Sequence, residues 1–484
     1  MKSCWKLFAE KYDGILKTAV NILSGALSEF QKNVLPIKLI SQSNYSDFES
    51  NNVIILATDN VEAIKKIKAL GLINIPNNEE GFSIYVGKSV YNPDKQMIVI
   101  SGGGESALLY GVIDFLNKYL GDIIHKNADI WDNEHFDSCF LKQLPEWKYS
   151  LYPKIKNRAI WSWGHVIYDY RAFFDAMVTL KLNQIVIWND VVPLNAKDII
   201  EYAHSRGIKV IWGFAWGWGT SCEKILNKYD TSALSVLKSQ VIEKYLAEYS
   251  DLDSDGIYFQ SFTELNTDSV NGKCVADLVV ELVNDIASDI FKIDPNIELQ
   301  FGLHATSVKK HLDTIAGVDE RIRIVWEDCG AFPFNYYPDR VDDFECTLDF
   351  TKRIRTLRGE AERFGAVIKG MTKLDWGKFE HFDSEYILGE RTNGYLHARL
   401  QHKNKLWKIL QGDWLQNAEY YKRVVKIIAE QGNDVVIEGL VEDGILERQI
   451  SMPVALYAEI LWDLESNINE LIGRVAKYPC VNFT

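Results

Sequence analysis

The sequence lacks the features that mark membrane and secreted proteins. No apolar run in its 484 residues is long enough to cross a membrane, and residues 1–13 mix Lys and Glu into their apolar pattern. We therefore expect neither a membrane span nor a signal peptide. The seven cysteines are odd in number, scattered, and without CxxC spacing. That usage argues against a disulfide framework and favours reduced thiols in a cytoplasmic protein.

The sequence also has fewer basic than acidic residues. Lys and Arg total 53 against 67 Asp and Glu, a formal net charge of −14. This balance argues against nucleic acid or an anionic membrane as a partner. The sequence has no Ser nucleophile elbow, no Cys/His pairing and no HExxH or other metal spacing. We expect no metal and no cofactor.

Aromatic residues are abundant, with 14 Trp, 23 Tyr and 22 Phe. Buried indoles need a partner for their N–H, and the flat faces of sugars stack well on indoles. Composition alone is compatible both with a large aromatic core and with a carbohydrate site.

The length predicts two or three domains. Residues 1–148 are typical of an α/β accessory domain, with a helix over 5–30, strands over 35–40, 53–57, 82–86 and 97–100, and helices over 61–70 and 105–120. The glycines at 102–104 lack the spacing and the Lys of a phosphate-binding loop, so they predict a strand-to-helix turn.

Residues 149–395 alternate strands with helical segments, which is the signature of a parallel α/β sheet or barrel. Strands are predicted over 158–163, 184–189, 207–214, 256–261, 298–303, 323–327 and 366–371, with an eighth near 386–388. A (β/α)8 TIM-type barrel is the expected closure for a domain of this size. Residues 396–484 predict a C-terminal helical region, with helices over 399–410, 418–431 and 453–475. Their apolar faces suit packing on the barrel or on a second copy of the chain, so a homodimer is one expected assembly.

Polar and aromatic residues collect at the ends of the predicted strands. They are Trp163, His165, Trp188, Asn189, Asp190, Trp216, Trp218, Glu264, His304, Glu327, Asp328, Lys373, Asp375 and Trp376. Each has a structural alternative, since Trp often fills cores and Glu264 precedes residues that cap helices well. The carboxyl ends of barrel strands meet at one rim, where barrel enzymes bind substrate. Carboxylates among indoles suit glycoside hydrolysis, in which one carboxylic acid protonates the leaving oxygen and a second carboxylate assists water or attacks.

These motifs resemble those of the α-glucuronidases that trim xylan, and more distantly those of the β-N-acetylhexosaminidases. The similar stretches are Arg158-Ala-Ile-Trp-Ser-Trp-Gly-His, Leu182-Asn-Gln-Ile-Val-Ile-Trp-Asn-Asp, Gly207-Ile-Lys-Val-Ile-Trp and Asp255-Gly-Ile-Tyr-Phe-Gln-Ser-Phe-Thr-Glu. The resemblance implies that Glu264 is the general acid and that Asp328, with Glu327 beside it, or Asp375 activates water. Substrate-binding roles are expected for Arg158, Trp163, His165, Trp188, Asn189, Asp190, Trp216, Trp218, His304, Lys373 and Trp376.

The sequence also departs from these families. Phe262-Thr-Glu-Leu stands where the α-glucuronidases have Asp-Ser-Glu-Gly, and the Asp-Glu pair of the hexosaminidases is missing at Thr263-Glu264. Acid and base candidates follow strand four and strands six or seven, so the resemblance and this spacing predict inversion. Neighbouring side chains on a strand point to opposite sides, and of Glu327 and Asp328 we predict Asp328 as the base.

Three functions remain open from sequence. The first is a glycoside hydrolase of small oligosaccharides, α-glucuronidase-like and inverting, with a β-N-acetylhexosaminidase-like enzyme as its alternative. The second is a catalytically inactive carbohydrate-binding barrel protein. The third is a lyase or aldolase, for which Lys373 is the candidate amine.

Overall fold

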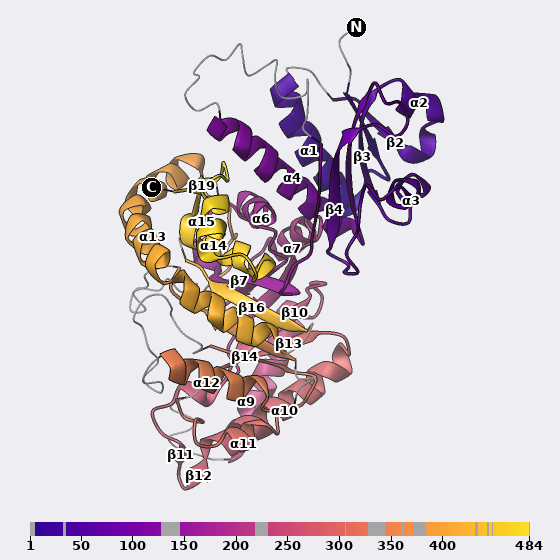
Figure 1. The fold of residues 1–484 in the computed structure, drawn as a ribbon. Coiled ribbons are helices and arrows are strands. Elements are labelled where there is room, and N and C mark those ends of the chain that lie inside the picture. Colours follow the sequence, from indigo (N-terminus) through magenta and orange to yellow (C-terminus); the bar gives the residue numbers. More distant parts are fainter. Residues whose placement is uncertain are drawn as a thin grey trace. The chain divides into compact units, whose positions relative to one another are not determined.

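An eight-stranded parallel barrel and a separate six-stranded sheet carry the architecture in a computed structural model (Figure 1). The structure describes residues 5–31, 35–126, 146–217, 231–304, 306–327, 344–359, 363–371, 384–430, 434–442, 445–447 and 449–483. The chain divides into two compact units. The first is Met1–Pro153 with His204–Gly207 and Ala476–Pro479, and the second is Lys154–Ala203, Ile208–Val475 and Cys480–Thr484. Within the described part of the chain, no helix is long and apolar enough to cross a membrane.

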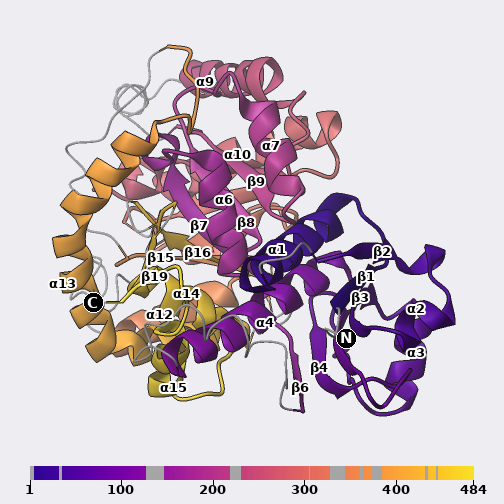
Figure 2. The same ribbon diagram turned by 90° about the horizontal axis from the view of Figure 1, so that it is seen from above.

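The first unit is a sheet with helices on both faces (Figure 2). Its strands lie in the order β2-β1-β3-β5-β4-β6, with β4 antiparallel to β5 and β6. The strands are β1 (Trp5–Ala9), β2 (Ile37–Leu39), β3 (Asn52–Thr58), β4 (Phe82–Lys88), β5 (Gln96–Gly102) and β6 (Trp147–Leu151). The helices are α1 (Gly14–Gln31), α2 (Tyr45–Glu49), α3 (Glu62–Ala69) and α4 (Glu105–Lys126), with a 3-10 turn η1 (Ile40–Gln42). The helix predicted over 5–30 is wrong at its start, because Trp5–Ala9 pairs with β2 and β3 before α1 begins.

The barrel of the second unit closes in the order β7-β8-β9-β10-β13-β14-β15-β16, with every pair parallel. Its strands are β7 (Asn157–Trp163), β8 (Gln184–Trp188), β9 (Lys209–Gly213), β10 (Gly256–Gln260), β13 (Glu298–Leu303), β14 (Arg323–Trp326), β15 (Phe364–Ile368) and β16 (Val435–Leu440). The predicted (β/α)8 class is confirmed, and seven of the eight strands lie where the sequence predicted them.

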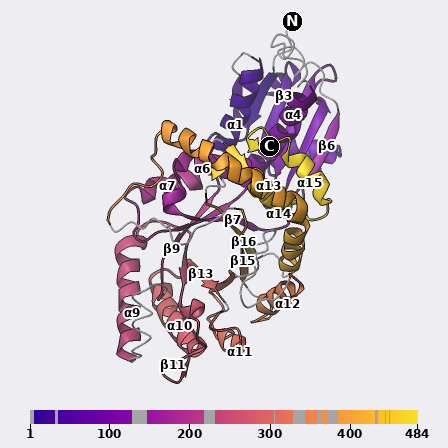
Figure 3. The ribbon, with the colours of Figure 1, turned by 90° about the vertical axis from the view of Figure 1, so that its left-hand side faces the viewer.

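Helices cover the outside of the barrel (Figure 3). They are α6 (Tyr170–Thr179), α7 (Ala196–His204), α9 (Thr231–Lys244), α10 (Val275–Ile293), α11 (Leu312–Ile315), α12 (Phe344–Arg355) and α13 (Asn393–Ala429). Short elements join them: 3-10 turns η2 (Gly164–Val166) and η4 (Phe262–Glu264), a π-helical turn η3 (Tyr245–Tyr249), and a hairpin of β11 (Ser269–Val270) and β12 (Lys273–Cys274). Side-chain caps fix two helix starts, since Asp169 accepts from the N–H of Ala172 and Thr392 from that of Tyr395.

The eighth strand is where the sequence prediction is wrong. Residues 386–388 form no strand, and β16, within the range predicted to be helical, pairs with both β15 and β7. A charged residue, Glu438, interrupts the apolar run of β16 and points into the barrel, which hid the strand from the hydrophobic pattern. The helices predicted over 399–410 and 418–431 are one continuous helix, α13.

The chain ends with β17 (Ile445–Leu446), β18 (Gln449–Ser451), α14 (Met452–Trp462), α15 (Ile468–Val475) and β19 (Val481–Asn482). The single helix predicted over 453–475 is two helices. It breaks at Asp463, whose carboxylate accepts from the backbone N–H groups of Glu465 and Ser466.

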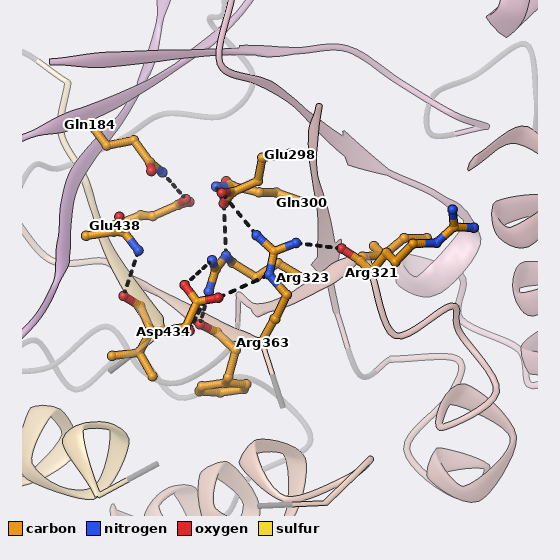
Figure 4. Close-up of polar contacts among 12 residues, drawn as sticks. Gln184, Glu298, Gln300, Arg321, Arg323, Arg363, Asp434 and Glu438 are labelled. Atoms are coloured by element: carbon orange, nitrogen blue, oxygen red, sulfur yellow. Dashed lines mark hydrogen bonds and ion pairs between the residues drawn. The ribbon is translucent and has the colours of Figure 1, made fainter. Parts of the chain in front are cut away.

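Two layers fill the barrel. A layer of apolar and aromatic side chains comes from alternate residues of the strands: Ala159, Trp161, Trp163, Val186, Trp188, Ile211, Tyr258, Val325, Val367, Val436 and Leu440. Toward the amino ends of the strands lies an ion cluster (Figure 4). There the buried guanidinium of Arg323 donates to Glu298 and to Asp434, and Arg363 contacts the same two carboxylates. These ion pairs fill the amino-terminal end of the barrel, so a candidate active site is expected at the opposite rim.

Candidate active site

Glu264 lies just after the end of β10, at the carboxyl rim of the barrel. Tyr258 and Gln260 point inward on this strand, so Phe259 points outward to the helices. The chain then turns through η4, which ends at Glu264. The buried hydroxyl of Thr263 accepts from the backbone N–H of His304, which ties this turn to the end of β13. The Glu264 side chain keeps 39% of its surface exposed, whereas those of His304 and Glu327 keep 7% each.

His304 joins two carboxylates. Its Nε2 atom lies 3.0 Å from Oε1 of Glu264 and 2.7 Å from Oε2 of Glu327. The three residues follow three consecutive barrel strands, β10, β13 and β14. The result is a carboxylate–imidazole–carboxylate chain that runs from a solvent-exposed acid to a buried one.

Glu327 is held as a carboxylate. Its Oε1 accepts from the hydroxyl of Tyr258 at 2.5 Å and from Nε2 of Gln260 at 2.5 Å. Burial by itself raises the pKa of Glu327, but the charge and hydrogen bond of His304, the charge of Lys369 and the Gln260 bond outweigh it. The net effect lowers the pKa to about 2. Glu327 therefore remains ionised throughout the neutral range.

The backbone of β13 approaches this carboxylate closely. A Cβ atom on Gly302 would lie 2.2 Å from Oε1 of Glu327 and 2.5 Å from the Tyr258 hydroxyl. The absence of a side chain at Gly302 is thus a condition for the Tyr258–Glu327 bond.

Aromatic rings pack beside the acidic chain. Trp161 stacks on Trp188 with ring centroids 5.9 Å apart, and Trp163 meets both edge-on. Tyr258 contacts Trp161 and Trp188 edge-on, so the wall of indoles extends to the partner of Glu327. All four side chains are buried. Trp163 and Trp188 therefore lie buried inside the barrel, and their predicted contact with substrate stays a prediction.

The ends of β7 and β8 bring further predicted residues to this rim. His165 lies in η2, half-buried, with its ring 6.1 Å from that of Trp163. Asn189 is buried, and its Oδ1 accepts from the Tyr386 hydroxyl at 2.5 Å. Its Nδ2 has no hydrogen-bond partner among the described residues. Asp190 is half-buried, its carbonyl accepts from Nζ of Lys244, and its negative charge adds to the burial that raises the pKa of Tyr386.

Two predicted binding residues do not face this rim. Arg158 lies at the amino end of β7, is fully buried, and donates to the carbonyls of Ile155, Lys156 and Lys181. The prediction is wrong because a strand-initial side chain lies at the opposite end of the barrel. Trp216 is also fully buried and stacks on the outward-facing ring of Phe259, with centroids 3.6 Å apart. It packs under the helices instead of lining the mouth.

Five predicted residues lie outside the described part of the chain: Trp218, Asp328, Lys373, Asp375 and Trp376. Their roles stay predictions. The sequence analysis missed Tyr258, Gln260 and Lys369, all of which act on Glu327. For Tyr258 and Gln260 the signal was present, because both alternate with outward residues on a strand that ends at the rim. Among the described residues, no group of three or more His, Cys, Asp and Glu side chains is placed to hold a metal ion.

Comparison with known proteins defines the class of the fold. No protein-family model matches the chain, and no curated protein matches it in sequence. Among solved structures it is similar to a family GH115 4-O-methyl-α-glucuronidase with specificity for decorated arabinogalactans, at 13% identity and a TM-score of 0.53. That match covers 97% of this chain but 58% of the enzyme, so the chain spans little more than half of that relative's length.

Two hexosaminidase structures are similar over nearly the whole chain. The β-N-acetylhexosaminidase from Bacteroides fragilis shares 13% identity at a TM-score of 0.52, over 98% of this chain and 90% of that one. The GH20 exo-β-N-acetylglucosaminidase from Vibrio harveyi shares 10% identity at 0.52, over 98% and 73%. The chain thus has the fold shared by these glycoside hydrolases, as the sequence motifs predicted.

Proposed function

We propose that the protein is a glycoside hydrolase that uses Glu264 as its general acid. The observation that carries the proposal is the Glu264–His304–Glu327 chain at the carboxyl ends of three consecutive strands, beside a wall of indoles. Glu264 is the solvent-exposed end of that chain, so it is the member that a glycosidic oxygen can approach. The fold shared with α-glucuronidases and hexosaminidases supports the same reaction class.

In this proposal Glu327 positions His304 and does not attack. Three donors share its charge, which stabilises the carboxylate and lowers its basicity. One nitrogen contacts both Glu264 and Glu327, so the two contacting oxygens lie closer together than the roughly 6.5–9.5 Å that an inverting pair needs for its water. The base is therefore assigned to Asp328 or Asp375, with inversion as the expected outcome.

His304 orients the acid. The shorter of its two contacts is to the ionised Glu327, so Nε2–H of His304 donates mainly to that carboxylate. The longer contact to Glu264 fixes the direction of the carboxyl group that the proposal makes the acid. The substrate class is a small oligosaccharide whose sugar face packs on the Trp163 and Trp188 side of the rim. An α-glucuronide is the first candidate and a β-N-acetylhexosaminide the second.

A panel of aryl glycosides that differ in sugar and in leaving group tests the assignment. Glu264→Gln is expected to lower kcat/KM at least 100-fold for poor leaving groups and far less for strongly acidic phenols, which depart without protonation. The matched control is Glu281→Gln, an exposed glutamate on α10, with unchanged rates. An equal loss for every leaving group would remove Glu264 as the acid.

The wild-type protein also separates the competing functions. Sugar binding without turnover of any aryl glycoside would identify a carbohydrate-binding barrel protein. NMR of the first-formed anomer reports the stereochemistry, and a retained configuration would contradict Asp328 and Asp375 as bases in an inverting site.

A further inference from the structure

A buried carboxyl group that the proposed reaction does not use lies inside the barrel. Glu438 on β16 is fully buried and points inward, opposite Ala159 of β7 and Val367 of β15. Nε2 of Gln184 on β8 lies 3.4 Å from its Oε1 (Figure 4). Neither the second carboxyl oxygen of Glu438 nor the amide oxygen of Gln184 has a partner among the described residues.

Within the described part of the chain, no cation forms an ion pair with Glu438. The charge of Arg323 acts on Glu438, but its Nε and Nη2 donate to Glu298 and Asp434, and its Nη1 donates to the carbonyls of Phe364 and Asp434. Lys209, level with Gln184 on β9, is exposed to solvent. The remaining groups that act on Glu438 are the carboxylates of Glu327 and Glu298, and Tyr258 lies close enough for the charge of Glu438 to act on it. An ionised Glu438 would face two negative charges at full burial.

A single proton on Glu438 would give both unpartnered oxygens a hydrogen bond. A protonated carboxyl has one O–H donor and one carbonyl acceptor, and a primary amide has the complementary pair. If Oε2 of Glu438 carries the proton, it donates to Oε1 of Gln184 while Nε2 of Gln184 donates to Oε1 of Glu438. The pair then closes a ring of two hydrogen bonds, and both orphan oxygens are satisfied.

We propose that Glu438 is held as a neutral carboxylic acid in a cyclic pair with Gln184, so that it adds no second negative charge beside Glu327. Burial is the main cause that raises its pKa far above the ordinary value, and the Glu327 and Glu298 carboxylates add to it. The activity measurement below rests on the proposed glycosidase function. The protonation state and the pairing do not.

Infrared spectroscopy of the full chain tests the protonation state directly. Near pH 8.5, above the pKa of about 7 of another buried acid, Glu447, the wild type is expected to show the carbonyl band of a protonated carboxyl group. The band should shift with ¹³C-labelled glutamate and be missing from Glu438→Gln. The exchanged double variant, Gln184→Glu with Glu438→Gln, restores one acid and one amide and should recover it. Identical wild-type and Glu438→Gln spectra would overturn the proposal.

Denaturant unfolding against pH is the second measurement. A proton held in the folded state and lost on unfolding makes the folding equilibrium constant of the wild type, relative to Glu438→Gln, fall about tenfold per pH unit between roughly pH 5 and 8. A ratio that stays constant over this range would mean that Glu438 is ionised in the folded protein. Should the single variant fail to fold, the exchanged double variant supplies the spectroscopic result.

The pH dependence of activity tests the charge of Glu438 separately. Replacing a neutral acid by its isosteric amide leaves the field at Glu327 unchanged, so the acid limb of the kcat/KM profile of Glu438→Gln should coincide with that of the wild type. A limb displaced to lower pH by a unit or more would show that Glu438 carries charge and would overturn the inference. If no glycoside is hydrolysed at all, the proposed function fails, while the spectra and the pH dependence of unfolding still decide the state of Glu438.

Discussion

The hydroxyl of Tyr258 lies 2.5 Å from Oε1 of Glu327, and both side chains are buried at the carboxyl end of the barrel. His304 contacts the other oxygen of this carboxylate, and its charge and hydrogen bond, together with Lys369 and Gln260, keep Glu327 charged although it is buried. The inner carboxylate, Glu327, is thus the charged end of the arrangement, and Glu264 is its more exposed end.

The low pKa of Glu327 predicts a specific acid sensitivity. A carboxylate whose folded pKa is about 2 stabilises the fold above the unfolded value of roughly 4.3, and this contribution is lost as pH falls toward 2. We expect Glu327→Gln to be less stable than the wild type by about 3 kcal/mol at pH 7, with the gap closing in acid. Denaturant titrations between pH 2 and 7 measure it, and Glu281→Gln is the control. A gap independent of pH would contradict the assigned ionisation.

Glu447 predicts the opposite dependence. Its Oε1 accepts from the backbone N–H groups of Tyr168 and Asp169, but burial dominates and raises its pKa to about 7. The folded protein thus binds a proton that the unfolded chain releases above about pH 4.3, so wild-type stability falls as pH rises from there to 7. Glu447→Gln should gain up to about 3 kcal/mol relative to the wild type at pH 8, and nothing near pH 4. Equal gains at both values would exclude the shifted group as the cause.

Arg158 predicts a loss of stability without a loss of substrate affinity. Its guanidinium satisfies three backbone carbonyls and lies 4.9 Å from the ring of Trp462, at the amino end of the barrel. Arg158→Met should cost about 3 kcal/mol or more, because buried carbonyls are left unsatisfied. KM for a turned-over glycoside should be unchanged. Arg353→Met, at an exposed position of α12, is the matched control. A raised KM with normal stability would restore the binding role that the sequence suggested.

Two glycines predict opposite effects of the same substitution. Gly302→Ala places a methyl group against Oε1 of Glu327 and the Tyr258 hydroxyl, so their bond must break or the strand must move. We expect a strong loss of activity and a lower Tm. Gly412 lies within α13 with no atom within 4 Å of a new Cβ, so Gly412→Ala should stabilise by about 0.5–1 kcal/mol with activity intact. Unchanged activity in Gly302→Ala would mean that the Tyr258 bond is dispensable.

The sequence predicted the barrel because its first seven strands are short apolar runs that end in polar residues. It also predicted that Glu264, His304 and Glu327 would gather at one rim, since parallel strands share an end. It could not show that Trp216 points outward or that Arg158 lies at the wrong end. Both depend on the alternation and register of strands, which an apolar run does not fix by itself.

The remaining failures come from buried polar side chains. Glu438 breaks the pattern of β16, and its neutral pairing with Gln184 depends on residues 254 positions apart in the chain. Glu447 likewise serves a turn far from it in sequence. These side chains find their hydrogen-bond partners only in the folded barrel, so no local sequence pattern predicts the pairs.

The position of β16 bears on how the protein is made. The strand that joins β15 to β7 follows the 37-residue helix α13 and ends at Leu440. During synthesis the first seven strands therefore leave the ribosome with two unpaired edges, and they keep them until the chain has been extended past this strand. A nascent chain stalled within α13 would expose both edges of a seven-stranded parallel sheet. Chaperones are expected to stay bound longest at that stage. Chains truncated before residue 435 should aggregate, whereas chains truncated after α14 contain β16 and should be able to close the barrel.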